Sequence, residues 1–115
     1  MADGVVWVAT TMSQIEKIIK EVWRASNERK ACRVILKDEP FPRVIHPYGV
    51  SQTSANKVVL VCRQVSGYTQ GGGTEGYRNL RLERITEVEI MDAHFEVDEG
   101  FDPTNSQYKD WVYHI

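Results

Sequence analysis

The chain has 115 residues, 42% hydrophobic and 26% charged, which fits one globular domain with a single core. A chain of this size buries roughly two-thirds of its unfolded surface on folding, so it needs neither a metal nor a disulfide for stability. No apolar run reaches the ~20 residues that cross a bilayer, and the first residues lack the pattern of a signal peptide. We therefore expect one cytoplasmic domain over residues 1–115, without a membrane segment.

The formal net charge of −2 is unevenly distributed along the chain. Residues 1–82 contain 12 Lys and Arg against 7 Asp and Glu, whereas residues 83–115 contain 2 against 9. This segregation fits a basic surface for an anionic partner, together with an acidic tail that keeps the fold soluble or covers part of that surface. It is also compatible with charges that simply mix in space once the chain folds.

The first well-marked element is a helix that begins after Ser13, where Ser13-Gln14-Ile15-Glu16 has the spacing of a capping box. Apolar residues then recur every three or four positions, which predicts a helix to about Asn27 with one stripe in the core. That stripe consists of Ile15, Ile18, Ile19, Val22 and Trp23. Ahead of the helix, residues 5–10 are β-prone, and we expect a short edge strand or an ordered arm there.

Segments of strand length follow the helix, joined by residues that favour turns. The predicted strands cover residues 31–37, 43–46, 57–64, 77–83 and 86–91. One connection begins with Pro47-Tyr48-Gly49, and another carries Gly71-Gly72-Gly73. The run Val58-Val59-Leu60-Val61 lacks polar residues, which predicts a strand buried on both sides. Apolar and polar residues alternate over 86–91, which predicts a strand with one face exposed to solvent. The fold expected is mainly β with one N-terminal helix (α+β), built on a small, strongly bent antiparallel sheet or barrel.

The acidic tail, residues 96–115, contains aromatic side chains, and we expect these to pack on the core formed by residues 13–95. They are Phe101, Tyr108, Trp111 and Tyr113. Cys32 and Cys62 lie in apolar runs and are interpreted as small buried hydrophobes. Neither has a Cys-x-x-Cys partner and the three histidines do not cluster, so we expect no metal and no cofactor.

Three blocks of the chain resemble, in order and spacing, the core of a WYL domain. They are Arg43-Val44-Ile45-His46-Pro47-Tyr48-Gly49-Val50, then Val58-Val59-Leu60-Val61, then Tyr77-Arg78-Asn79-Leu80-Arg81-Leu82-Glu83-Arg84-Ile85. The resemblance covers residues 13–95, and its most specific part is the last block, which is similar to the family's Arg-x-Phe-Arg-Leu-Asp-Arg-Ile strand. The naming Trp-Tyr-Leu triplet reads Val58-Val59-Leu60 here, and Leu80 and Glu83 replace the aromatic residue and the aspartate of the last block.

The resemblance implies an Sm-like or SH3-like small β-barrel without catalytic activity. It also implies a ligand-sensing module of bacterial transcription regulation or defence, which binds nucleic acid or a nucleotide-like molecule. The family's usual DNA-reading helix-turn-helix has no counterpart in the twelve residues that precede Ser13. We therefore expect a standalone or dissected sensor module, or an accessory protein.

Arginines in or beside the predicted strands are the main candidate ligand contacts, because a planar guanidinium can hold a phosphate through two parallel hydrogen bonds. Two-residue alternation puts Arg78 and Arg84 on one face and Arg81 on the other, so they share a surface only if a bulge or sheet curvature intervenes. The alternative is that Arg81 and Arg84 pair with carboxylates such as Glu83, Glu87 or Glu89 on neighbouring strands. The complete candidate set is Arg43, His46, Tyr48, Arg63, Tyr77, Arg78, Arg81 and Arg84.

The aromatic members of this set have two interpretations. Tyr48 and Tyr77 can stack on bases, but such tyrosines more often pack with the hydroxyl at a rim. His46 can contact a ligand or serve the structure alone. The glycine-rich loop over 65–76 can close over a ligand through its amides. Because no Lys-Ser or Lys-Thr follows the glycines, it is not a P-loop, and a flexible hairpin tip is the simpler interpretation.

Three functions remain open from the residues. The first is a non-catalytic regulatory module that binds single-stranded nucleic acid or a nucleotide-like anion through the strand arginines. The second is a protein-interaction module, or a homodimer, that docks through a β edge or the aromatic tail. The third is an enzyme, which we do not expect, because no nucleophile beside a base and no suitably spaced carboxylate pair stands out.

Overall fold

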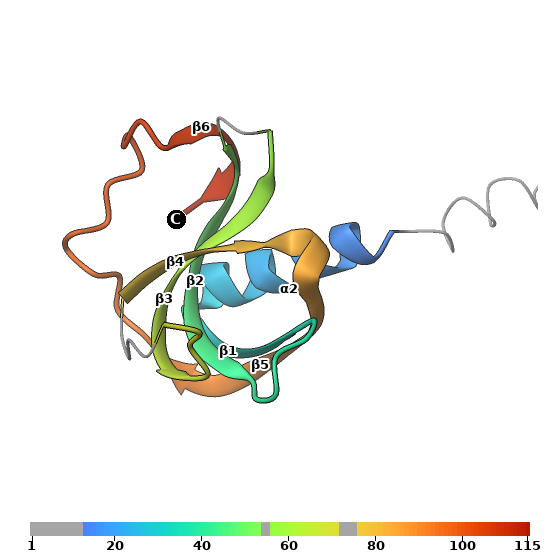
Figure 1. Ribbon diagram of the computed structural model, residues 1–115. Helices are drawn as coiled ribbons and strands as arrows, with labels where there is room; N and C mark the ends of the chain where they lie inside the picture. Colours follow the sequence, from blue (N-terminus) through green and yellow to red (C-terminus); the bar gives the residue numbers. More distant parts are fainter. Residues whose placement is uncertain (1–12, 54–55, 72–75) are drawn as a thin grey trace, which may run out of the picture.

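A computed structural model describes residues 13–53, 56–71 and 76–115 (Figure 1). Over these ranges the chain forms helix α2 (Gln14–Glu28), then β1 (Lys30–Leu36), β2 (Arg43–Thr53), β3 (Val58–Gly67), β4 (Gly76–Arg81), the 3₁₀ helix η1 (Leu82–Arg84), β5 (Ile85–His94) and β6 (Tyr108–His114). The mainly β fold with a leading helix is therefore confirmed. The strand or arm predicted over 5–10 lies outside the described residues, as does most of the glycine triplet. Within the described ranges, no helix has the length and apolar character needed to cross a bilayer.

Helix α2 begins at the predicted cap, where Ser13 Oγ accepts a hydrogen bond from the Glu16 amide and donates one to the Glu16 carboxylate, both at 3.1 Å. It ends at Arg29, whose left-handed φ of 54° lets its amide bond to carbonyls of the last turn.

The buried stripe of α2 differs from the predicted one. It consists of Ile18, Val22, Ala25 and Ser26. The prediction was wrong for Ile15 and Trp23, which are 37% and 50% exposed. Small residues at 25 and 26 let the last turns of the helix approach the sheet, and Ser26 Oγ donates a hydrogen bond to the Pro47 carbonyl at 2.9 Å. The face of α2 that contacts the sheet therefore includes these small residues and leaves out the larger Ile15 and Trp23.

The strands form one antiparallel sheet in the order β4-β3-β2-β1-β5, with β6 added to β2. Figure 1 shows this sheet curving around α2. Its two end strands, β4 and β5, are joined by η1, and the amide of Lys37 donates to the carbonyl of Arg84 at 2.8 Å. The sheet thus bends back on itself without closing.

Strand β2 is longer than predicted and continues through Pro47-Tyr48-Gly49, which we had expected to be a connection. Pro47 has no N–H to donate and is therefore unusual inside a central strand. A register shift between Pro47 and Gly49 in the pairing of β2 with β3 accommodates it. One edge of β2 pairs with β1 over residues 43–45 and with β6 over residues 49–53. This long strand therefore connects the core to the tail.

Strand β3 has the two-sided burial that its apolar run predicts. Val59, Leu60 and Val61 are buried, although Val58 at the start of the strand is exposed. Leu60 belongs to the core cluster around α2. Its neighbours Val59 and Val61 point to the opposite side of the sheet, because strand side chains alternate between the faces. Both faces of β3 are therefore covered.

Strand β6 was not predicted, because charged Lys109 and Asp110 interrupt its apolar pattern. Its pairing with β2 and two anchors at its end hold it in place. The Tyr113 hydroxyl lies 3.0 Å from Ser26 Oγ, and the Ile115 amide donates to the Tyr48 carbonyl at 2.9 Å. The last residues of the acidic tail are therefore part of the sheet.

The interpretation of the cysteines is confirmed, since Cys32 and Cys62 are both completely buried. Burial raises the pKa of each thiol to about 12, so the reactive thiolate is scarce in the folded protein. We predict that neither thiol reacts with Ellman's reagent under native conditions and that both react in denaturant. Rapid native labelling of either one would show that β1 or β3 opens locally.

Candidate functional site

Four of the predicted arginines surround one surface depression of about 220 Å³, called here the arginine depression. It is lined by Leu36, Arg43, Gln70, Arg78, Asn79, Leu80, Arg81 and Arg84. Arg43 comes from the start of β2, Arg78 and Arg81 from β4, and Arg84 from η1. Alternation predicted Arg81 on the face opposite Arg78 and Arg84, yet all three line this hollow, which lies where the end strand β4 passes into η1.

Arg43 is the buried member of the arginine depression, and its guanidinium already donates hydrogen bonds to other side chains. Its Nε and Nη2 donate to the Glu39 carboxylate at 2.9 and 2.7 Å, and its Nη1 donates to Gln64 Oε1 at 3.1 Å. The hydrogen bond to Glu39 raises the pKa of Arg43 above its ordinary value. Arg43 is therefore a rigid, charge-matched part of the depression.

The other three arginines of the depression have weaker ties. Arg84 donates to the Lys37 carbonyl at 2.9 Å, and Arg78 donates to the Tyr77 carbonyl at 3.0 Å. Arg81 pairs with the exposed carboxylate of Glu83, as one of the alternatives predicted. In the part of the chain that the structure describes, neither Arg78 nor Arg84 forms an ion pair. Their charges can therefore serve an incoming anion.

The remaining four predicted site residues, His46, Tyr48, Arg63 and Tyr77, lie apart from the depression, near the tail. His46 stacks on Phe95 with ring centroids 4.6 Å apart, and its pKa is lowered by burial and by Arg63. Tyr48 is fully buried, and its hydroxyl accepts a hydrogen bond from the Asp98 amide at 2.9 Å. The hydrogen bond between Tyr48 and Asp98 joins the sheet to the tail.

Tyr77 is the exposed member of this group, and its hydroxyl bonds to the Asp98 carboxylate. The bond lowers the pKa of Asp98. Arg63 pairs with Tyr77 in the register of β3 and β4, and its charge contributes to the lowered pKa values of both His46 and Asp98. The predicted set thus divides into the arginine depression and a second, mainly aromatic group.

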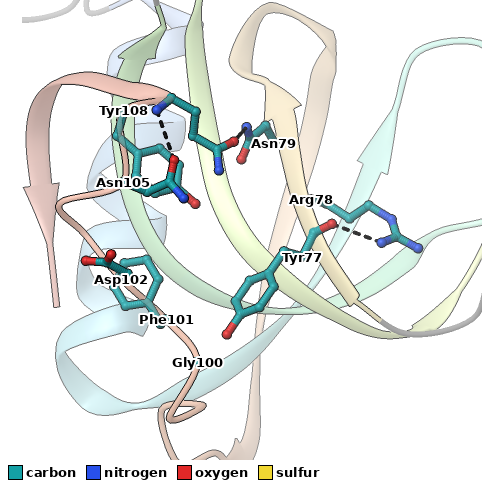
Figure 2. A pocket seen from close by; sticks show the side chains of 9 residues that line it. Tyr77, Arg78, Asn79, Gly100, Phe101, Asp102, Asn105 and Tyr108 are labelled. Atoms are coloured by element: carbon teal, nitrogen blue, oxygen red, sulfur yellow. Dashed lines mark hydrogen bonds between the residues drawn. The ribbon is translucent and has the colours of Figure 1, made fainter.

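A second hollow, called here the tail pocket, lies between β4 and the tail and has a volume of about 200 Å³ (Figure 2). It is lined by Tyr77, Arg78, Asn79, Gly100, Phe101, Asp102, Asn105, Gln107 and Tyr108. Figure 2 shows the Tyr77 ring directed into the gap, while the Arg78 side chain leaves β4 in another direction. The amide residues of this pocket were not among the predicted site residues. Side-chain alternation along β4 could have placed Asn79 on the same side of the strand as Tyr77.

The acidic tail leaves the arginine depression open. No described residue from 96–115 lines that depression, although Arg78 also lines the tail pocket beside residues of the tail. No described group of three or more His, Cys, Asp or Glu side chains is arranged to hold a metal ion.

The comparisons with known proteins find no relative: no protein-family model, curated protein or solved structure matches this chain. The resemblance to a WYL domain therefore stays a prediction that rests on the three sequence blocks.

Proposed function

We propose that this protein is a non-catalytic regulatory module that binds a nucleotide or single-stranded nucleic acid by holding a phosphate in the arginine depression. The observation that carries the proposal is the convergence of Arg78, Arg81 and Arg84 beside the anchored Arg43. Among the described residues, the lining includes four arginines and no acidic side chain. Guanidinium groups form short, charge-assisted hydrogen bonds with phosphate oxygens, often in pairs.

The existing contacts of the arginines support a phosphate ligand. Arg78 and Arg84 donate to neutral backbone carbonyls, so a phosphate would add the missing negative charge. The ion pair between Arg43 and Glu39 keeps the wall of the site in one conformation, which lowers the entropy lost on binding. At about 220 Å³, the depression is smaller than the roughly 300–1,000 Å³ pockets of drug-sized ligands and has room for a phosphate group.

The biological setting is part of the same proposal. A leading helix, the strand order β4-β3-β2-β1-β5 and a 3₁₀ turn between β4 and β5 support an Sm-like or SH3-like small barrel. Together with the resemblance to a WYL domain, this favours ligand sensing in bacterial transcription regulation or defence, inside the cytoplasm.

Fluorescence anisotropy with labelled single-stranded DNA and RNA, at low and high salt, tests the proposal. We expect saturable binding that weakens with salt, because bound phosphates release counterions. The Arg78→Ala/Arg84→Ala double variant should lose at least ~100-fold in affinity, since a hydrogen bond to a charged group contributes about 1.5–3 kcal/mol.

The matched control is the Arg24→Ala/Arg33→Ala double variant, which removes the same charge from two exposed arginines that have carboxylate partners elsewhere. It should bind within roughly threefold of wild type, because neither Arg24 nor Arg33 lines the arginine depression, and it should stay folded, because each exposed pair contributes only about 0–1 kcal/mol of stability. Equal losses in both variants would mean that net charge alone drives binding. Absence of binding at low salt to the oligonucleotides and to labelled nucleotides would refute the proposal.

The second candidate is a protein-docking module, which the end strands favour. Strands β4 and β5 terminate the sheet path, and an end strand can accept a strand from a partner. Binding of that kind would depend little on salt and would survive in the Arg78→Ala/Arg84→Ala variant.

A further inference from the structure

The tail pocket and the arginine depression meet at β4. Arg78 and Asn79 line both hollows. Side chains alternate between the two sides of a strand, so Arg78 reaches the depression while its neighbours Tyr77 and Asn79 face the tail. Because β4 ends the sheet path, one ligand can contact both hollows by passing around this strand.

The lining of the tail pocket suits a flat, uncharged ring. Tyr77 is 41% exposed, and the partly buried rings of Phe101 and Tyr108 complete an aromatic wall. The amide side chains are Asn79, Asn105 and Gln107. Each amide carries both a donor and an acceptor, which is what the edge of a nucleobase requires. The charged lining residues are Asp102 and Arg78, and Figure 2 shows the Arg78 guanidinium directed away from the Tyr77 ring.

Hydrogen bonds hold the walls of the tail pocket in place before any ligand enters. Asn79 Nδ2 donates to Gln107 Oε1 at 3.0 Å, and Tyr77 bonds to Asp98, so the tail is tied to β4 at two points. The Tyr108 amide donates to the Asn105 carbonyl at 3.0 Å, which shapes the turn between them. A preformed pocket binds with a smaller entropy loss than one that must be assembled.

We propose that the tail pocket binds the base of the nucleotide whose phosphate lies in the arginine depression. This inference rests on the proposed function and adds a base-recognition site to it. The rings of Tyr77, Phe101 and Tyr108 form the stacking surface, and the three amides contact the edge of the base. At about 200 Å³, the pocket accepts one ring system. The ligand class is therefore a base-bearing phosphate, bound around the edge of β4.

The test compares inorganic pyrophosphate, ribose 5-phosphate and the four ribonucleoside triphosphates by isothermal titration calorimetry. We expect wild type to bind at least one triphosphate ~10-fold or more tighter than pyrophosphate, because stacking on an aromatic side chain contributes roughly 1–3 kcal/mol per base. Tyr77→Leu and, separately, Gln107→Leu should remove most of this difference and leave pyrophosphate binding unchanged, because neither Tyr77 nor Gln107 lines the arginine depression. Unchanged pyrophosphate binding also shows that each variant is folded. Ser106→Ala, in the same tail turn but outside the pocket lining, is the control and should bind like wild type.

The outcomes separate the two proposals. If triphosphates bind no tighter than pyrophosphate, or if both pocket variants keep the preference, the base site is wrong while phosphate binding stands. If the variants weaken ribose 5-phosphate as much as the triphosphates, the pocket holds the sugar and the base assignment is wrong. If none of the probes binds wild type, the proposed function fails and the base site fails with it.

Discussion

Replacing Glu39 with glutamine is expected to lower the free energy of unfolding by about 3–5 kcal/mol, the cost of removing one partner from a buried ion pair. The Glu39 side chain is only 1% exposed and that of Arg43 only 9%, so water cannot replace the lost carboxylate. Arg43 stays charged at every accessible pH, which leaves it buried beside a neutral amide. For a domain with about 5–15 kcal/mol of total stability, this loss is a large fraction.

Urea unfolding followed by circular dichroism measures the effect, with Glu83→Gln as the matched control. Glu83 pairs with Arg81 on the exposed rim of the same depression, so its loss should cost only about 0–1 kcal/mol. The double variant Glu39→Leu/Arg43→Met removes both charges and should recover most of the stability. A Glu39→Gln variant as stable as Glu83→Gln would contradict the buried, charge-matched role of Arg43.

Gly49→Val is expected to lower the free energy of unfolding by about 3 kcal/mol, at the upper end of the cost of overpacking. Gly49 lies in the part of β2 that pairs with β6. A Cβ atom there would lie 2.5 Å from the Tyr113 carbonyl oxygen and 2.7 Å from Trp111 Cζ3. Because the obstacle includes backbone, β6 itself must move away, and its pairing with β2 must weaken.

Amide hydrogen exchange over β6, combined with urea unfolding, tests this expectation. Exchange should accelerate at Tyr108–His114 more than in β1 or β3. Gly71→Val is the control, since nothing lies within 4 Å of a Cβ at that position, and we expect a change within about 0.5 kcal/mol. Normal stability and normal protection of β6 in Gly49→Val would show that β6 packs less closely on Gly49 than the structure indicates.

Several elements could be predicted because their signals are local. The cap at Ser13 and the three- and four-residue repeat identify α2, and the apolar run at 58–61 identifies the buried strand β3. Turn residues separate the strands, and in the described part of the chain each of the five strands predicted between the helix and the tail has a counterpart, β1 to β5. Local signals failed where packing overrides them. Trp23 lies on the apolar repeat but outside the contact face, and Pro47 lies within a strand because a register shift accommodates it.

The candidate site shows the same division. Residue types alone predicted arginines that bind an anion, since the chemistry of guanidinium does not depend on the fold. Which arginines line one hollow depends on the tertiary structure, because Arg78 and Arg81 lie in the end strand β4, Arg84 lies in η1 and Arg43 comes from the distant strand β2. The tail pocket depends on β6, whose pairing partner β2 lies more than fifty residues earlier in the chain.

The sequence by itself determined the helix, the apolar strands, the small buried cysteines and the supply of arginines, because each of these follows from the residue or from its immediate neighbours. The tertiary structure alone decided that Arg43 is bound by Glu39, that Tyr48 is buried under the tail, and that two unlike hollows share β4. The physical reason is that side-chain periodicity is local, whereas strand register, sheet curvature and the docking of the tail depend on contacts between distant segments.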